Sequence, residues 1–305
     1  MKNYLSSNIS LKGCIIPMIF MIITYATLIF TMNPQSSYVA YGFLSFIAFF
    51  ASAISLSFCM RKGIINGLFI EEEPLKFDGS LGRYFLILIG YTLLSMITVG
   101  ITIPLLIKKS QCFFIDNTTY KKEAFKFKGK IQAMVIFMII YLAAFITISI
   151  IAGTQLKNGN IPSGSNFLPL VIVYPLILVL ISFISAYLYN WYANIDYKNY
   201  NFHFRSSFSA YITPWLLTIL GTVFSLGLVT PFLNIWIAKK YINDLEATNE
   251  ESTVTFSEEL DIKEDGIYLL GQTILTIFTI GIYLPIAQQK ILNRIIPKIA
   301  YTKES

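Results

Sequence analysis

Hydrophobic residues gather in seven long runs that are separated by polar connections. The runs lie at about 13–32, 38–60, 84–107, 131–152, 167–190, 211–238 and 267–289. An apolar helix of about 20 residues is long enough to cross the ~30 Å hydrocarbon core of a membrane. The pattern therefore predicts an all-α integral membrane protein, built as a multi-pass helical bundle with short amphipathic links on its cytoplasmic face.

Three of the runs contain the same Gly-x-x-x-Pro sequence. The three copies are Gly100 to Pro104, Gly227 to Pro231, and Gly281 to Pro285. Proline lacks an amide donor and clashes with the preceding helical turn, while glycine tolerates the backbone angles of a sharp bend. We therefore predict that these six residues are structural hinges, which produce three broken or re-entrant helical units.

Charge placement bears on how the broken runs are oriented. The connection 33–37 carries no charge, whereas the connections 61–83 and 108–130 are rich in Lys and Arg. These two basic connections flank the run 84–107, and the positive-inside rule assigns both to the cytoplasm. That run would then enter and leave the membrane on the same face.

Two topologies remain open from the sequence. In the first, the three hinge-containing runs are re-entrant, the other four cross the membrane, and both termini are cytoplasmic. In the second, all seven runs cross and the hinges are kinks, which membrane helices tolerate. Either topology divides the chain into an N-terminal helical hairpin (1–60), a first repeat unit (61–130), a transmembrane helix pair (131–190), a second repeat unit (191–250) and a third repeat unit with the C-terminal tail (251–305).

Short extended pieces accompany the broken runs. They read "LKFDG" (75–79), "FHFRS" (202–206) and "VTFSE" (254–258), with a further copy in "AFKFKGK" (124–130). Alternating Phe and Lys has the period of a strand with one apolar face. Such strands lie at the lipid headgroups or pair with one another in a small cytoplasmic sheet, and the alternative is that they are amphipathic linkers.

Composition agrees with a membrane protein and argues against nucleic-acid binding. Charged residues make up 13% of the chain, against about 25% in soluble domains. The net charge of +6 is spread between the apolar runs, so we interpret it as a topology signal. Cys14, Cys59 and Cys112 are odd in number and scattered, and they predict neither a metal site nor a disulfide framework.

Residues suited to catalysis are scarce. His203 is the only histidine, and a catalytic triad or a metalloprotease motif cannot be built around it. The acidic stretches 71–74 and 257–266 lack the ligand spacing of a calcium loop, so we interpret them as solvated loops. The chain is therefore predicted to be no enzyme and to hold no cofactor and no metal. A lipid-modifying enzyme would have to use Glu258 and Glu259.

Two functional hypotheses follow. Basic, aromatic-rich edges favour a non-enzymatic scaffold or lipid-interacting component whose partners are membrane lipids, alone or as a homo-oligomer. The alternative is a channel or transporter for small polar solutes, because broken helices can build binding sites. Hydroxyl groups near the hinges would line its path, namely those of Ser95, Thr98, Thr222, Ser225, Thr276 and Thr279.

Residues 75–130 resemble the YjgN-type family of uncharacterised bacterial inner-membrane proteins. The resemblance rests on Phe77, Gly79, "RYF" (83–85), "TVGI" (98–101), Pro104, Lys108, Asn117, Thr118 and "FKFKG" (125–129), and it recurs more loosely at 202–240 and 256–290. The family usually has Trp after the proline, where this chain has Leu105, Phe232 and Ile286. The resemblance implies a multi-pass protein of the bacterial cytoplasmic membrane of unknown activity, and it supplies no catalytic residues.

Overall fold

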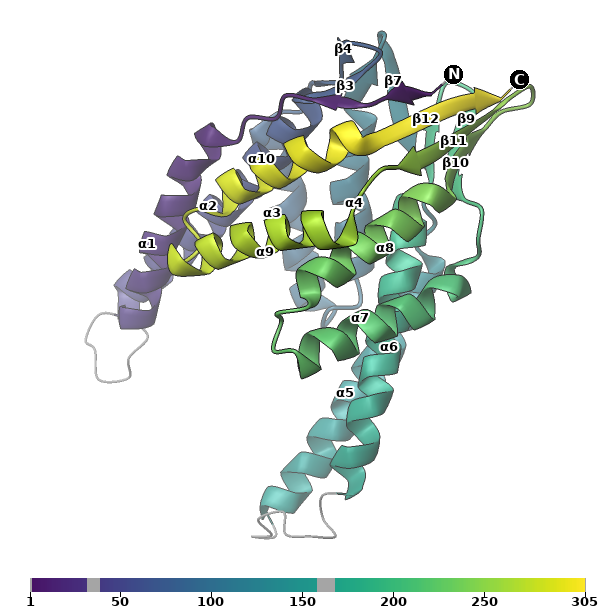
Figure 1. Ribbon diagram of the computed structural model, residues 1–305. Coiled ribbons are helices and arrows are strands. Elements are labelled where there is room, and N and C mark those ends of the chain that lie inside the picture. The colour runs from purple at the N-terminus through teal and green to yellow at the C-terminus, as the bar shows by residue number, and fades with distance from the viewer. Residues whose placement is uncertain (1, 32–38, 158–167, 305) are drawn as a thin grey trace.

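The computed structural model describes residues 2–31, 39–157 and 168–304. Helices in these ranges form five helical hairpins along the chain (Figure 1). The hairpins are α1 (Ile15–Thr31) with α2 (Val39–Asn66), α3 (Leu81–Ile97) with α4 (Ile103–Asp116), α5 (Gln132–Lys157) with α6 (Leu168–Tyr192), α7 (Ile212–Phe224) with α8 (Thr230–Asp244), and α9 (Ile262–Phe278) with α10 (Leu284–Ile295).

Short strands follow each helical hairpin and form two antiparallel sheets. The nine-stranded sheet has the order β1-β12-β11-β10-β9-β8-β7-β6-β5, and the three-stranded sheet has the order β2-β3-β4. The strands are β1 (Asn3–Tyr4), β2 (Ser6–Ser7), β3 (Leu68–Ile70), β4 (Glu73–Pro74), β5 (Lys76–Phe77), β6 (Thr118–Tyr120), β7 (Glu123–Phe127), β8 (Ile195–Tyr197), β9 (Tyr200–Phe204), β10 (Leu245–Thr248), β11 (Thr253–Glu258) and β12 (Ile299–Glu304).

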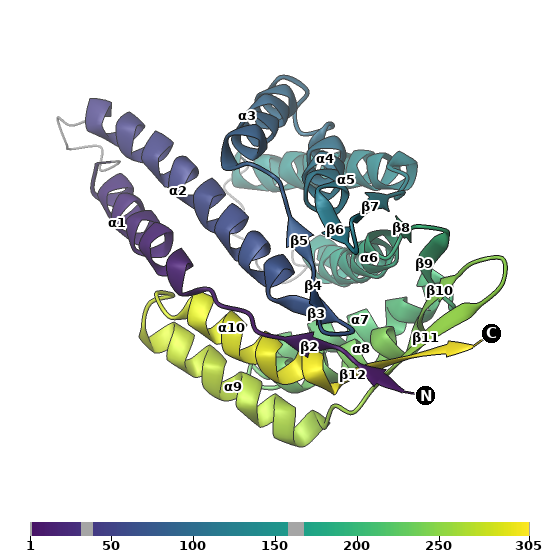
Figure 2. The same ribbon diagram turned by 90° about the horizontal axis from the view of Figure 1, so that it is seen from above.

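The two sheets join into one closed circuit, which we call the strand ring. Residues 3–7 pair with β12 through β1 and with β3 through β2. Residues 73–77 pair with β3 through β4 and with β6 through β5. Every strand segment therefore has a neighbour on both sides, and Figure 2 shows the segments arranged as a ring. Closure removes the unpaired edges that make isolated short strands unstable.

The expectation of an all-α multi-pass bundle is wrong. The nine-stranded antiparallel sheet contradicts it, and only two of the described helical stretches, Lys12–Thr31 and Tyr41–Asn66, are long and apolar enough to cross a membrane. Our prediction failed because each strand is only two to six residues long. Such strands become stable through partners far away in the sequence, and a pattern read along the chain does not reveal those partners.

The three predicted hinges lie at the tips of the short helical hairpins, away from the strand ring. Gly100, Gly227 and Gly281 have φ values of 87°, 88° and 86°, a region open to glycine at little cost. The amide of each glycine donates to the carbonyl five residues earlier, at 2.7–2.8 Å. The proline that follows each glycine lies in the first turn of the second helix, where its missing amide costs nothing.

The hydrophobic core lies where the helical hairpins join the strand ring. Aromatic side chains dominate two of its clusters, one around Phe77, Phe113 and Tyr84 and another around Phe127 and Trp191. The ends of the second helices are also fastened to the ring by similar hydrogen bonds. Asn66 accepts from the amide of Phe77 at 2.9 Å, and Asp116 accepts from the amide of Phe127, eleven positions later in both cases, at the same distance.

Candidate ligand-binding cavities

The strand ring lines a partly open cavity of about 470 Å³, which we call the ring cavity. Because successive residues of a strand point to opposite faces, alternate side chains of each segment face inward. Phe202 and Phe256 line the cavity in this way, while His203 faces outward. Aromatic residues dominate the lining of the ring cavity: Phe69, Tyr120, Phe125, Tyr197, Tyr200, Phe202, Phe256 and Tyr301.

The tyrosine hydroxyl groups of the ring cavity are bonded to the ring itself. Tyr120 donates to the carbonyl of Ile70 at 3.1 Å, and Tyr197 donates to the carbonyl of Tyr120 at 2.9 Å. The hydroxyl of Tyr200 lies 2.8 Å from that of Ser252. Since these polar groups already have partners, the cavity presents mainly aromatic ring surface to a ligand, which suits an apolar chain.

Charged residues lie at one end of the ring cavity. The Nζ of Lys121 lies 2.7 Å from Glu71, and Tyr301 donates to the same carboxylate at 3.3 Å. The hydrogen bond from Lys121 is the main reason that the pKa of Glu71 is lowered. Glu71 is therefore ionised near neutral pH, and with Lys303 it makes this end of the cavity polar.

A second cavity, which we call the helix cavity, adjoins the first and has a volume of about 610 Å³. Residues of α2, α4 and α6 line it, together with the neighbouring strands of the ring. Leu75 and Phe125 line both cavities, so they form the boundary between them. Arg61 of α2 is the charged residue in its lining, and its Nη1 donates to Oε1 of Gln111 at 3.0 Å.

The predicted hinge residues do not line either of these cavities. Pro104 lines a separate space of about 110 Å³ between α4, α5 and α6. The hydroxyl groups near the hinges are occupied locally, because Thr98 and Thr279 donate to carbonyls four residues earlier at 2.9 Å. Thr222 accepts from the hydroxyl of Thr230 at 2.9 Å. These contacts give no support to a polar path along the hinges.

His203, Glu258 and Glu259 have structural partners. The Nε2 of His203 lies 3.0 Å from Glu246 on the outer face of the ring, where the two residues are opposite each other in the strand pairing. Glu258 lies 2.9 Å from the Nζ of Lys239, and Glu259 accepts from Tyr4 at 2.5 Å. None of these three side chains lines the ring cavity or the helix cavity.

The acidic stretch 257–266 is not the solvated loop that we expected. It contains the end of β11 and the first turn of α9, where Asp265 is fully buried. Arg294 and Lys298 each donate to the Asp265 carboxylate at 2.7 Å, which explains how a buried charge is tolerated. In the described part of the chain, His, Cys, Asp and Glu side chains form no group of three or more that could hold a metal ion.

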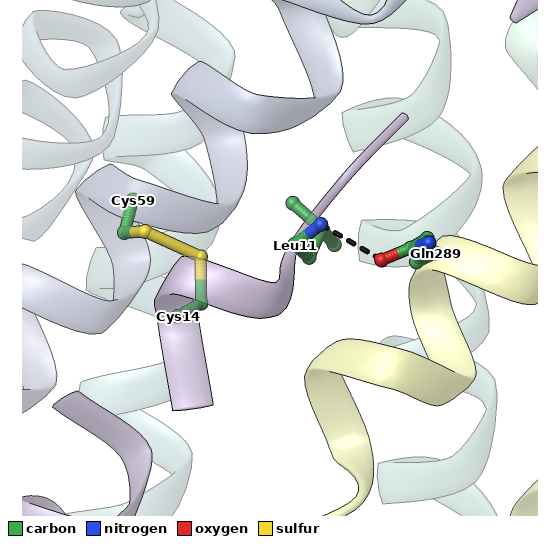
Figure 3. Close-up of a disulfide and its surroundings, with 4 residues drawn as sticks. All are labelled: Leu11, Cys14, Cys59 and Gln289. Atoms are coloured by element: carbon green, nitrogen blue, oxygen red, sulfur yellow. Dashed lines mark hydrogen bonds between the residues drawn. A yellow bond between two sulfur atoms is a disulfide. The ribbon is translucent and has the colours of Figure 1, made fainter. Parts of the chain in front are cut away.

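The cysteines also differ from the prediction. Cys14 and Cys59 form a disulfide that joins the chain just before α1 to α2, as Figure 3 shows, while Cys112 is free. Their separation of 45 residues gives no sequence signal, because the packing of α1 against α2 brings them together. Nearby, the amide of Leu11 donates to Gln289 of α10 at 2.9 Å, so the same region contacts the last helical hairpin.

Sequence reasoning missed both cavities, although it recognised some of their strands. Phe125, Phe202 and Phe256 belong to the predicted extended pieces, and the alternation of Phe with Lys around Phe125 indicates a strand. Tyr120 and Tyr197 belong to three-residue strands, which are too short to show a period. From the sequence, Arg61 is noted only as one of the basic residues in the connection 61–83. The periodicity of the sequence therefore predicts the aromatic strands. It does not predict which helix side chains line the cavities.

Comparison with known proteins gives a family and no described activity. A family model described as "Bacterial protein of unknown function (DUF898)" matches residues 4–265. That span includes four of the five helical hairpins described above and both cavity boundary residues. No curated protein and no solved structure matches the chain. The chain therefore belongs to the DUF898 family of bacterial proteins of unknown function, and its resemblance to YjgN-type proteins is confirmed.

Proposed function

We propose that this protein is a non-enzymatic, lipid-interacting protein of the bacterial cytoplasmic membrane, and that its strand ring binds the apolar part of an amphipathic molecule. The ring cavity carries the proposal. Its volume of about 470 Å³ falls within the range of about 300–1,000 Å³ typical of small-molecule sites. Aromatic walls suit the apolar chain of such a molecule.

The surface of the helical hairpins supports a membrane location. Large apolar side chains at the tips of the short hairpins are exposed, with Leu226 at 93%, Phe278 at 81% and Ile97 at 80%. Clusters of exposed apolar residues of this kind mark surfaces that contact lipid or another protein. The stretches Lys12–Thr31 and Tyr41–Asn66 are also long and apolar enough to cross a membrane. Lipid is therefore the partner that accounts for all of these surfaces.

Helix lengths suggest how the chain sits in the membrane. At 1.5 Å per residue, the 13 residues of α7 extend for about 20 Å, too short to cross, whereas the 26 residues of α5 extend for about 39 Å. We propose that the α1–α2 hairpin, whose helices are long and apolar enough, crosses the membrane, and that the α5–α6 hairpin also crosses because of its length. The three short hairpins would enter one leaflet and return. The basic residues near the strand ring favour a cytoplasmic ring with both termini on that side.

The experiment uses displacement of a fluorescent fatty acid from the full chain in detergent. Ala247 is buried, lines the ring cavity and lies opposite Val254, so Ala247→Phe fills cavity space. We expect this variant to weaken probe binding at least tenfold. Ala124→Phe makes the same change on β7 at an exposed position that does not line the cavity, and it serves as the control. If Ala247→Phe and Ala124→Phe are both folded and bind the probe with the same affinity as the wild type, the proposal is contradicted.

A further inference from the structure

Arg61 occupies an unusual position on α2. It is the first charged residue after the apolar residues 41–60, so in the proposed membrane arrangement it lies at the level of the lipid headgroups. Arginines at this level commonly extend toward the outer surface and the surrounding lipid. Arg61 also lines the helix cavity, while its side chain stays exposed.

The contacts of Arg61 are all with uncharged groups. Its guanidinium donates to Gln111, and its Cζ lies 4.8 Å from the centre of the Phe114 ring. Within residues 2–31, 39–157 and 168–304, no carboxylate forms an ion pair with it. Asp265, by comparison, is neutralised by two cations. An exposed arginine without a counter-charge, beside an apolar cavity, can bind the anionic group of a ligand.

The helix cavity, which Arg61 lines, lies next to the ring cavity. Leu75 and Phe125 border both spaces, so a ligand group placed at Arg61 lies next to the aromatic ring cavity, with these two side chains between the cavities. A planar guanidinium binds phosphate through two parallel hydrogen bonds, which a lysine ammonium does not do. The arrangement combines a site for one anionic group with a neighbouring site for one apolar chain.

We propose that Arg61 binds the phosphate headgroup of an anionic lipid whose chain occupies the ring cavity. This inference rests on the proposed function, because it assigns the polar end of the same ligand. A lipid accounts for the site better than free phosphate does, because both adjoining cavities are lined mainly by apolar side chains. The helix cavity is therefore the specificity site, and the ring cavity is the site that holds the chain.

The test compares two lysophospholipids that share one oleoyl chain, lysophosphatidic acid and lysophosphatidylcholine, by displacement of the fatty-acid probe. We expect the wild-type chain to bind the phosphate monoester at least tenfold more tightly than the choline ester. Arg61→Gln should lower the affinity for the phosphate monoester to the affinity for the choline ester. The affinity for the choline ester itself should not change. Lys62→Gln removes the neighbouring charge, which does not line the cavity, and should change neither affinity.

The possible outcomes distinguish a failure of the Arg61 inference from a failure of the proposed function. Equal binding of both lipids by the wild-type chain, or an unchanged preference in Arg61→Gln, overturns the role of Arg61 and leaves the ring cavity as a lipid site. Failure of both lipids to displace the probe overturns the proposed function and this inference together. Arg61-dependent binding of inorganic phosphate alone, at the affinity of the phosphate monoester, would show a free-anion site and overturn the lipid assignment. Arg61→Lys should bind the phosphate monoester with intermediate affinity, which checks that the loss in Arg61→Gln is not one of folding.

Discussion

Asp265 shows how single residues hold the base of the last helical hairpin in place. Its carboxylate accepts hydrogen bonds from Arg294 on α10 and from Lys298 just before β12. Burial alone would raise its pKa, but the bonds from Lys298 and Arg294 outweigh burial and lower the pKa. One fully buried side chain thus connects α9, α10 and the strand that closes the ring.

We predict that Asp265→Asn destabilises the protein by about 3–5 kcal/mol at pH 7, because it removes the counter-charge of Lys298 and leaves Arg294 with only the exposed Glu264. The folded pKa lies below the unfolded value of about 3.9. The contribution of Asp265 is therefore present above about pH 4 and is lost as the pH falls through the folded pKa. Thermal unfolding in detergent at pH 7 and pH 3 measures this, and the two proteins should differ less at pH 3.

Glu264→Gln provides the control for this comparison. Glu264 also contacts Arg294, but its side chain is largely exposed, and exposed pairs contribute at most about 1 kcal/mol. A loss of stability in Glu264→Gln as large as that in Asp265→Asn would contradict the importance of burial.

Among the elements, the helical hairpins differ in how far the sequence predicts them. The Gly-x-x-x-Pro pattern located three tips, since Gly100 and its counterparts need a positive φ that other residues avoid. The sequence did not predict that β7 pairs with β8 across the whole of the α5–α6 hairpin, because strand pairing leaves no local signal. Nor did it predict the disulfide, which depends on how α1 lies against α2.

The side of the membrane that the ring faces can be tested with introduced cysteines. In a Cys112→Ser background, we expect Lys76→Cys and Lys122→Cys to react with an impermeant maleimide from the cytoplasmic side only. Leu226→Cys at a hairpin tip should be protected from both sides, because lipid surrounds it. Inverted vesicles expose the cytoplasmic side to the reagent, and intact cells expose the outer side. Labelling of detergent-solubilised protein shows that all three thiols can react.

Two features of the molecule favour opposite results in this labelling experiment. The basic residues near the ring favour the cytoplasm, whereas disulfides such as Cys14–Cys59 persist mainly in oxidising compartments. Labelling of positions 76 and 122 from outside would reverse the proposed orientation. Labelling of the two positions from opposite sides would end the proposal that the α3–α4 hairpin enters and returns.

At the scale of the molecule, the described residues form five similar units closed in a circle. Each unit is a helical hairpin followed by strands, and the fifth unit borrows residues 3–7 from the other end of the chain to pair with β12. The ring cavity exists because this circle closes. Its walls come from residues as distant as Leu5 and Lys303, so reasoning from local sequence patterns could find individual wall residues but not the cavity.

Closure of the ring can be weakened at one hydrogen bond. The amide of Leu5 donates to the carbonyl of Ile299 at 2.9 Å, and Leu5→Pro removes this donor. We expect a loss of about 1–3 kcal/mol in stability, weaker binding of the fatty-acid probe, and unchanged helical content by circular dichroism. Lys2→Pro lies outside β1 and should behave like the wild type. Full probe binding by Leu5→Pro would show that the cavity does not depend on closure.

The pairing of β1 with β12 also sets an order of events during biosynthesis. Strand β1 leaves the ribosome before the five described helical hairpins, and its partner β12 emerges after them. The hairpins can enter the lipid one by one as translation proceeds, but the circle of strands stays open until its last member is released. A nascent chain stalled before residue 299 would therefore be membrane-bound and still unable to retain a ligand.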